Sequence, residues 1–485
     1  MKPEITTRAE PLDALRVAAE LEHGLMAQYL FAVYSLKRYT WEGLDAVQLE
    51  RVRRWSSSIA LIARQEMEHL GLALNLLSSV GGTPSFTRPN MPQRADYYGQ
   101  ANIKLALTRG DLDTILRFQR FEAPDELTRK LGPDEHIDQK KARKWCGTKD
   151  KRVGSRAQLT AMLEEQPDAP LLGGAPVLGF GWDSVQDLYE SILAGFESLS
   201  ATMGERNLFV GKALPQIFGG PRSPQHGGMN DLNQYDVDLI AVTNLGTARQ
   251  AITMILEQGE GIKVNAAYLR WTHFCLFTGI REDMEKYDLG DIAARPVVPN
   301  PMTILHPDVG PRDEVTLLTN GATIEVAKLF NQSYELMLLL LLFLYSENVK
   351  TQEEVNGLMD AAFFPLMTMF VRPLAELLTE MPAFEGGRRK GLWTAGPGFE
   401  LNGDVLLFPR IGATWDLFQE RIDTIVAGYE LLLRDGDPWL DLPNQRESGE
   451  AHSRIWRRLD YLRSNMQRLA ADWRAHWLNI GFTGA

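Results

Sequence analysis

The segment ARQEMEHLGLALNLL, at 63–77, holds a carboxylate and an imidazole where both can do chemistry. On a helix, Glu66 shares a face with Ile62 and Leu70, so its carboxylate points where the apolar side chains point. His69, three positions later, lies on that same face. A buried, unpaired carboxylate costs on the order of several kcal/mol, whereas a divalent metal ion takes a carboxylate and a neutral imidazole as ligands. The spacing therefore indicates a metal site, with a satisfied polar cluster as the alternative.

A second buried acid, Glu22, is predicted on the preceding helix, where its same-face neighbours are apolar. Glu20 and His23 repeat the spacing of Glu66 and His69, but they share a mixed surface on which they need no metal. Antiparallel helices bring together residues that are equally distant from the turn between them. The midpoint of Glu22 and Glu66 falls beside Gly43, in the expected turn, so the two acids should face each other.

A second pair of segments, LEQGEG at 256–261 and LRWTHF at 269–274, supplies further candidate ligands. A second Glu-x-x-His motif would place its acid at position 270, but this residue is Arg270, which cannot bind a metal. Either the third helix replaces the missing acid by supplying both Glu257 and Glu260 as ligands, or only one metal binds tightly. The predicted ligands are Glu22, Glu66, His69, Glu257, Glu260 and His273. Four carboxylates and two imidazoles suit a carboxylate-bridged di-iron or di-manganese centre in a four-helix bundle.

Tyr29 is a candidate catalytic residue beside this centre. It lies two helical turns after Glu22 and is expected on the metal-facing side. There its phenol can donate a hydrogen bond to a ligand or take part in one-electron chemistry. The alternative is an ordinary core tyrosine.

The elements that must position these residues are long helices, because helical periodicity dominates the chain and strand-like alternation is scarce. Two hairpins are predicted, from helices at 10–39 and 46–80 and from helices at 236–257 and 264–280. About 150 residues separate the hairpins, which requires a long crossover of the kind found in ferritin-like bundles. Further helices are predicted at 110–121, 185–200, 326–347, 359–380, 415–434 and 452–477.

The predicted fold is therefore all-α. A ferritin-like four-helix bundle is expected at 1–290, with an insertion at about 83–235. A proline-studded stretch near residue 300 marks a boundary, beyond which a mostly helical annex is expected at 291–485.

Composition excludes several classes of protein. The net charge of −12 argues against a nucleic-acid binder. The apolar run Leu336–Tyr345 is about half as long as a membrane span and indicates a buried helix. The first residues lack the apolar core of a signal peptide, and Cys146 and Cys275 provide no disulfide framework. A cytoplasmic location without membrane contact is expected.

Six motifs, in order between about residues 10 and 282, carry a family resemblance: ELEHGLMAQYL, ARQEMEHLGLALNLLSSVGG, FQRFEAP, DLYESI, LEQGEG and THF. Together they resemble the ferritin-like domain of the iminophenyl-pyruvate dimer synthase family, whose members act in violacein- and rebeccamycin-type bisindole biosynthesis. TAGPGFE, at 394–400, is similar to a further element of that family. The resemblance implies a ferritin-like bundle with metal ligands at the six matching positions named above.

The implied activity is that of a non-haem iron oxidoreductase of natural-product biosynthesis, with one or two iron ions, or manganese, as cofactor. Its expected substrate is a small aromatic or amino-acid-derived molecule that bears an amine or imine, and oxidative imine coupling is one form of the reaction. An upstream amino-acid-oxidising enzyme is the expected partner. Metal storage or detoxification in the manner of ferritins and a metal-free scaffold are the alternatives. The oligomeric state is left open, with a homodimer as one option.

Overall fold

A computed structural model describes residues 5–479 of the chain with several gaps. The residues outside the description are 1–4, 95–96, 99–104, 129–130, 132–134, 148–181, 183, 214–215, 218–238, 260–270, 347–350, 387–392, 406–409, 443, 446–449 and 480–485. The regular secondary structure of the described part is almost entirely helical, and its only strands are the two-residue β1 (Pro301–Met302) and β2 (Thr316–Leu317), which pair in parallel. The fold is all-α, as predicted.

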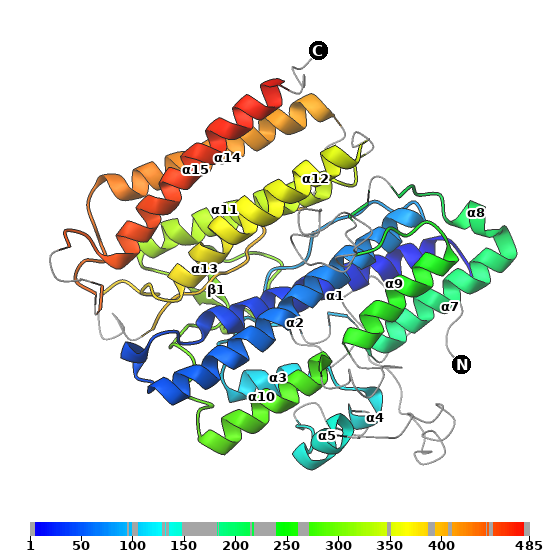
Figure 1. The fold of residues 1–485 in the computed structure, drawn as a ribbon, viewed down its shortest axis with the longest axis horizontal. Coiled ribbons are helices and arrows are strands. Elements are labelled where there is room, and N and C mark those ends of the chain that lie inside the picture. The colour runs from blue at the N-terminus through cyan, green and yellow to red at the C-terminus, as the bar shows by residue number, and fades with distance from the viewer. Residues whose placement is uncertain are drawn as a thin grey trace, which may run out of the picture.

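Two long antiparallel helices, α1 (Ala9–Ser35) and α2 (Ala46–Ser79), form the hairpin at the centre of the molecule (Figure 1). Gly43 ends the turn between them with a φ of 88°, a left-handed conformation that glycine adopts without steric cost. Asp45 then caps α2, because its carboxylate accepts hydrogen bonds from the amides of Val47 and Gln48. The hairpin matches the predicted helices to within a few residues.

Shorter helices cover the two halves of one side of this hairpin (Figure 1). The helices α3 (Leu112–Phe121) and α10 (His273–Tyr287) pack together on one half, and α7 (Val185–Met203) and α9 (Leu245–Gln258) pack together on the other. Three short helices lie beside these pairs: α4 (Asp125–Thr128), α5 (Gln139–Cys146) and α8 (Glu205–Leu208). Both helix pairs therefore have ends near the middle of the hairpin, where a site can form between them.

The C-terminal helices cover another side of the hairpin (Figure 1). They are α11 (Gly321–Phe343), α12 (Gln352–Ala361), α13 (Arg372–Leu378), α14 (Ile411–Arg434) and α15 (Arg454–Asn479). A π-helix at Ala362–Val371 joins α12 to α13 and contains Pro365, which lacks an amide hydrogen and so interrupts the regular helical hydrogen bonds. Because α13 packs on α1, the annex covers the hairpin directly.

One main hydrophobic core runs through both the bundle and the annex, from Ile5 to Trp473. The division at about residue 290 therefore stays a prediction. A small second core consists of Ala123, Ile137, Ala142, Phe274 and Cys275. It lies where the segment after α3 and helix α5 meet the first turn of α10.

Two further expectations have clear outcomes. The apolar run at 336–345 belongs to α11, the one described helix that is long and apolar enough to cross a membrane, and 83% of its most apolar window is buried inside the protein. The prediction of a buried helix is thus confirmed. Cys146 and Cys275 form a disulfide, which corrects the expectation that they provide no disulfide framework. The two residues are 129 positions apart, and only the fold brings α5 onto α10.

Candidate metal centre

Two groups of buried ligand residues meet at the middle of the α1–α2 hairpin. The first ligand group contains Glu22, Glu66 and His69, and the second contains Glu66, Glu122 and His273. Within each group, one potential ligand atom from every residue lies within 4.8 Å of the others. Glu66 belongs to both groups, so the carboxylate sits at the centre of the arrangement.

The two oxygens of Glu66 face different imidazoles. Its Oε2 lies 3.1 Å from Nδ1 of His69, and its Oε1 lies 2.9 Å from Nδ1 of His273. The outer carboxylates complete the groups, since Glu22 lies 3.7 Å from His69 Nδ1 and Glu122 lies 3.2 Å from His273 Nδ1. The result is an approximately symmetric pair of sites, each with one imidazole, one outer carboxylate and one oxygen of the shared Glu66.

A glutamine orients each imidazole. Nε2 of His69 lies 2.9 Å from Oε1 of Gln258, the last residue of α9, and Nε2 of His273 lies 3.2 Å from Oε1 of Gln65. When Nε2 carries the hydrogen and donates it to the amide oxygen, Nδ1 is left with a lone pair directed at the carboxylates. This is the arrangement that metal-binding histidines commonly have, with the other ring nitrogen held by a hydrogen bond.

A tyrosine holds each outer carboxylate. The hydroxyl of Tyr189, on α7, donates to Oε1 of Glu22 at 2.8 Å, and the hydroxyl of Tyr29, on α1, donates to Oε1 of Glu122. Burial raises the pKa of both phenols well above its usual range, and the adjacent carboxylates raise it further. Both tyrosines therefore stay protonated and act as hydrogen-bond donors.

The charges of this cluster explain how it tolerates burial. Burial opposes the charged form of each imidazole, but the neighbouring carboxylates outweigh it: Glu122 and Glu66 raise the pKa of His273 to about 9. Likewise, Glu66 and Glu22 raise the pKa of His69 well above its usual range. Burial alone would raise the pKa of Glu66, yet the two imidazoles hold it well below normal. Without a metal, protons on the imidazoles balance the carboxylates, and a metal ion would have to displace them.

The donor set fits one or two metal ions. Metal–oxygen and metal–nitrogen bonds are about 2.0–2.2 Å long, so donors across a shared ion lie about 4 Å apart. Each group, with its donors within 4.8 Å, meets this requirement after small side-chain movements. Carboxylate and imidazole ligands suit iron, manganese or zinc rather than a thiolate-preferring ion. Glu66 is placed to bridge two such ions.

Four of the six predicted ligands come together in this centre: Glu22, Glu66, His69 and His273. Glu257 is half-buried on α9 and contributes no atom to either group. The buried stripe of α9, Ala251 and Ile255, continues to Gln258 rather than to Glu257, since adjacent helical residues point about 100° apart. Glu260 and Arg270 lie outside the described residues. Glu122 supplies the second outer carboxylate instead.

Glu122 and Tyr189 were missed by the sequence analysis, although both lie in motifs that carried the resemblance, FQRFEAP and DLYESI. Glu122 directly follows α3, with the buried Phe118 four positions before it and the buried Ile115 seven before it. This is the same signal that identified Glu66. The predicted helix at 110–121 ends one residue before Glu122, so this residue was not considered as part of a helical face.

Two polar side chains of the hairpin that belong to neither ligand group, those of His23 and Glu68, are buried. His23, expected on a mixed surface, is 0% exposed and contacts the hydroxyl of Tyr334 on α11, so the annex covers this face of α1. Glu68, two positions after Glu66 on α2, is 2% exposed and lies 3.7 Å from the guanidinium of Arg64. The sequence of the hairpin alone does not reveal which of its faces other segments cover.

An apolar cavity of about 60 Å³ lies between the hairpin and the annex. Methionines from four segments line it, namely Met26, Met67, Met337 and Met367, together with the aromatic rings of Tyr34, Phe86, Tyr334, Phe363 and Phe399. Phe399 has a φ of 49°, a left-handed conformation that is unusual for a bulky residue and often marks a functional position. Met26 on α1 and Leu70 on α2 are among the residues that line the cavity, but no residue of either ligand group does.

Two characterised proteins are similar to this chain. The dichlorochromopyrrolate synthase of Lentzea aerocolonigenes is 26% identical over 446 residues, covering 84% of this chain and 37% of its own length. The 2-imino-3-(indol-3-yl)propanoate dimerase of Chromobacterium violaceum is 23% identical over 416 residues, covering 81% of this chain and 34% of its own length. The chain thus spans about a third of the length of these relatives. Both matches confirm the resemblance that the motifs indicated.

A solved structure is also similar. A ferritin-like protein from Caulobacter vibrioides aligns with 74% of this chain and 97% of its own, at a TM-score of 0.39 and 15% identity. A comparison with protein-family models matches residues 15–282, which include every ligand residue of the candidate centre, to the family described as Ferritin-like. Because this match covers more than half of the sequence, the chain belongs to the Ferritin-like family.

Proposed function

We propose that the chain is a non-haem, metal-dependent oxidoreductase with a carboxylate-bridged pair of iron ions. The observation that carries the proposal is the shared Glu66, whose two oxygens face two imidazoles, each accompanied by its own outer carboxylate. A single ion would need only one of these groups. A polar core cluster without a metal would need neither the repeated donor set nor the two glutamines behind the imidazoles.

In this proposal Glu66 would contribute an oxygen to each metal position, and Glu22 with His69 and Glu122 with His273 would complete the two positions. Gln258 and Gln65 hold the Nε2 atoms, so that the Nδ1 atoms would be free to bind metal. Tyr29 and Tyr189 act as positioning residues, because they hold a proton at the hydroxyl next to each outer carboxylate. A bound pair of iron ions would supply electron transfer between the substrate and dioxygen or peroxide. The burial of the ligands excludes water from this chemistry.

We propose a small aromatic, amino-acid-derived substrate that bears an amine or imine. The names of the two relatives, a dichlorochromopyrrolate synthase and a dimerase of an indolyl imino acid, support this class. Oxidative coupling removes two electrons and two protons from the substrates. Hydrogen peroxide would accept them and be reduced to two water molecules, or dioxygen would accept them and be reduced to hydrogen peroxide. An upstream amino-acid-oxidising enzyme would supply the imine.

Metal analysis of the full-length protein, produced with added iron, tests the proposal. The wild-type chain is expected to bind two iron ions and to change its optical spectrum when oxygen is admitted to the anaerobic, reduced sample. Glu66→Gln, which keeps the shape of the side chain, should lose most of the metal from both positions. Glu257→Gln is the matched control, because Glu257 belongs to neither ligand group and its replacement should leave the metal content unchanged.

Three results would contradict the proposal. A folded wild-type protein that binds no metal and has a melting temperature insensitive to chelators would indicate a scaffold. A native mass of hundreds of kilodaltons with many irons per chain would indicate metal storage. Unchanged metal content in Glu66→Gln, with circular dichroism confirming the fold of the variant, would show that the metal binds elsewhere.

A further inference from the structure

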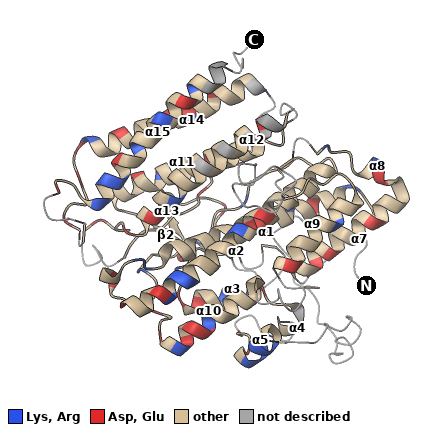
Figure 2. Ribbon diagram, viewed as in Figure 1, with Lys and Arg blue, Asp and Glu red and all other residues tan. Residues whose placement is uncertain are grey.

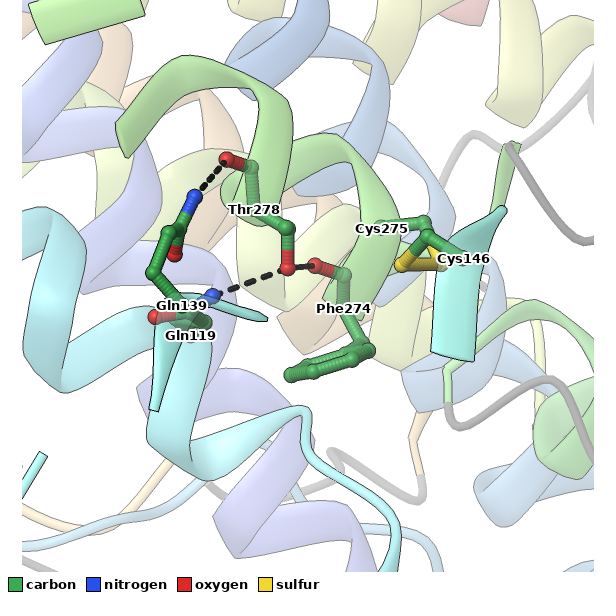
Figure 3. Close-up of a disulfide and its surroundings, with 6 residues drawn as sticks. All are labelled: Gln119, Gln139, Cys146, Phe274, Cys275 and Thr278. Atoms are coloured by element: carbon green, nitrogen blue, oxygen red, sulfur yellow. Dashed lines mark hydrogen bonds between the residues drawn. A yellow bond between two sulfur atoms is a disulfide. The ribbon is translucent and has the colours of Figure 1, made fainter. Parts of the chain in front are cut away.

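The disulfide joins α5 to the first turn of α10, which carries the ligand His273 of the second group. Cys146 is the last residue of α5, and Cys275 lies in the first turn of α10, two residues after His273 (Figure 3). Cys275 is buried, with 7% of its surface exposed, whereas Cys146 is only half-buried. A reductant can thus reach the bond from the side of α5.

The small core surrounds this bond and connects it to both ligands. Its members Phe274 and Cys275 directly follow His273, and its member Ala123 directly follows Glu122. Ile137 and Ala142 complete it from the segment before α5 and from α5 itself. The small core therefore fixes the backbone on which Glu122 and His273 stand.

Two further kinds of contact join α10 to the α3–α5 segment. The rings of Phe118 and Phe277 pack with their centroids 5.4 Å apart, and several side chains form polar contacts. Gln119 and Gln139 donate to the hydroxyl and the carbonyl of Thr278, at 2.8 and 3.3 Å (Figure 3). Helix α5 is rich in basic residues (Figure 2). Its Arg143 pairs with Glu282 on α10 at 3.1 Å, but both side chains are about half exposed, and such pairs stabilise little. Among these contacts, the disulfide is the strongest constraint on the first turn of α10.

We propose that the Cys146–Cys275 disulfide is a redox-sensitive positioning element for the second metal position. The oxidised form holds His273 and Glu122 together. Reduction breaks the sulfur–sulfur bond, adds two electrons and two protons from a cellular dithiol that is itself oxidised to a disulfide, and leaves two protein thiols. The second position then loses metal affinity, while the first, built on α1 and α2, keeps it. The inference rests on the proposed two-metal centre.

The test compares metal binding by the oxidised full-length protein, by the same protein after reduction with a phosphine, and by Cys146→Ser. Titration of the apo-protein with Mn²⁺ gives the affinity of each position. In the reduced protein and in Cys146→Ser, the second position should weaken by about 10-fold to 100-fold, the range typical when a residue supporting a metal ligand is lost. The affinity of the first position should not change. Lys144→Ser, at an exposed position on the same helix, is the matched control and should bind as the wild type does.

Alkylation of protein purified without reductant, followed by mass spectrometry, reports the state of the cysteines. Neither cysteine should be alkylated, because both are held in the disulfide. Alkylation of both cysteines, even when the protein is treated with an oxidant beforehand, would overturn the inference. Equal affinities of both positions in the oxidised, reduced and Cys146→Ser forms would overturn it as well, and would leave the two-metal centre intact. An oxidised wild-type protein that binds no Mn²⁺ or iron would instead contradict the proposed function.

Discussion

The two ligand groups have the same donors but different supports. Glu22, Glu66 and His69 stand on α1 and α2, helices of 27 and 34 residues that are packed through the main core. Glu122 follows the last residue of a short helix and His273 is the first residue of another, and a small core with one disulfide holds their neighbours. The first group should therefore be rigid, because the main core holds both of its helices in place. The second depends on local contacts, so it should be the more sensitive to mutation, redox state and pH.

The largest effects are expected when the outer carboxylates are replaced one at a time. Glu22→Gln should remove the metal from the first position and Glu122→Gln from the second, so that each variant keeps one ion per chain, because Glu66 still serves the position that remains. Metal analysis measures the stoichiometry, and the Mn²⁺ electron paramagnetic resonance spectrum distinguishes a coupled pair from a single ion. Loss of both ions from both variants would contradict the assignment of two separable positions.

The two cores can be compared with a matched pair of phenylalanines on α10. Phe274 belongs to the small core and Phe277 to the main core, and both are 0% exposed. Phe277→Ala should lower the free energy of unfolding of the whole protein by about 3–5 kcal/mol, the usual cost of such a cavity. Phe274→Ala should act locally instead, raising hydrogen exchange in α5 and weakening the second metal position.

Denaturant titration and hydrogen-exchange mass spectrometry measure these two effects. Equal global destabilisation by the two variants, with no local increase in exchange around α5, would mean that the small core is an integral part of the main one. The comparison between the two supports would then be wrong.

The sequence revealed the first group and only part of the second, for a physical reason. Within one hairpin, helical periodicity fixes which residues share a face, and the short turn at Gly43 fixes which residues face each other. Glu22 and Glu66 followed from these two facts alone. The partners of His273 depend on contacts between segments about 150 residues apart, which periodicity does not encode. Periodicity did hold the information that Gln258 rather than Glu257 faces the centre, and that Glu122 lies on a buried face.

A third expected effect is a pH dependence of the apo-protein. The pKa of His273 is about 9, raised by Glu122 and Glu66 against the opposing effect of burial. An imidazole whose pKa is raised in the folded state contributes stability that is fully present below its ordinary pKa of about 6.5 and is lost as the pH rises through about 9. The free energy of unfolding should therefore fall between pH 6.5 and 9.

Metal binding should have the opposite pH dependence, since the imidazole must lose its proton to bind the ion. Mn²⁺ affinity at the second position should rise over the same pH range, and calorimetry in buffers of different ionisation enthalpy measures the protons released. His273→Gln, which cannot take up a proton, is the control and should make the stability profile of the apo-protein less steep, since only the raised pKa of His69 then remains. A wild-type profile that is already flat between pH 6.5 and 9 would contradict a protonated His273.

The smallest effects are expected from replacing the two tyrosines, each of which donates a hydrogen bond to an outer carboxylate on another segment. Tyr29 stands on α1 but donates to Glu122 of the second group, whereas Tyr189 stands on α7 and donates to Glu22 of the first. Tyr29→Phe should weaken metal binding at the second position by about tenfold, the lower end of the range for a lost supporting hydrogen bond. Tyr189→Phe should weaken the first position by less, because α1 and α2 hold Glu22 and His69 in place without it. Metal titrations of the two variants give the two affinities separately, and a larger loss in Tyr189→Phe would mean that the long helices give the first group no advantage in rigidity.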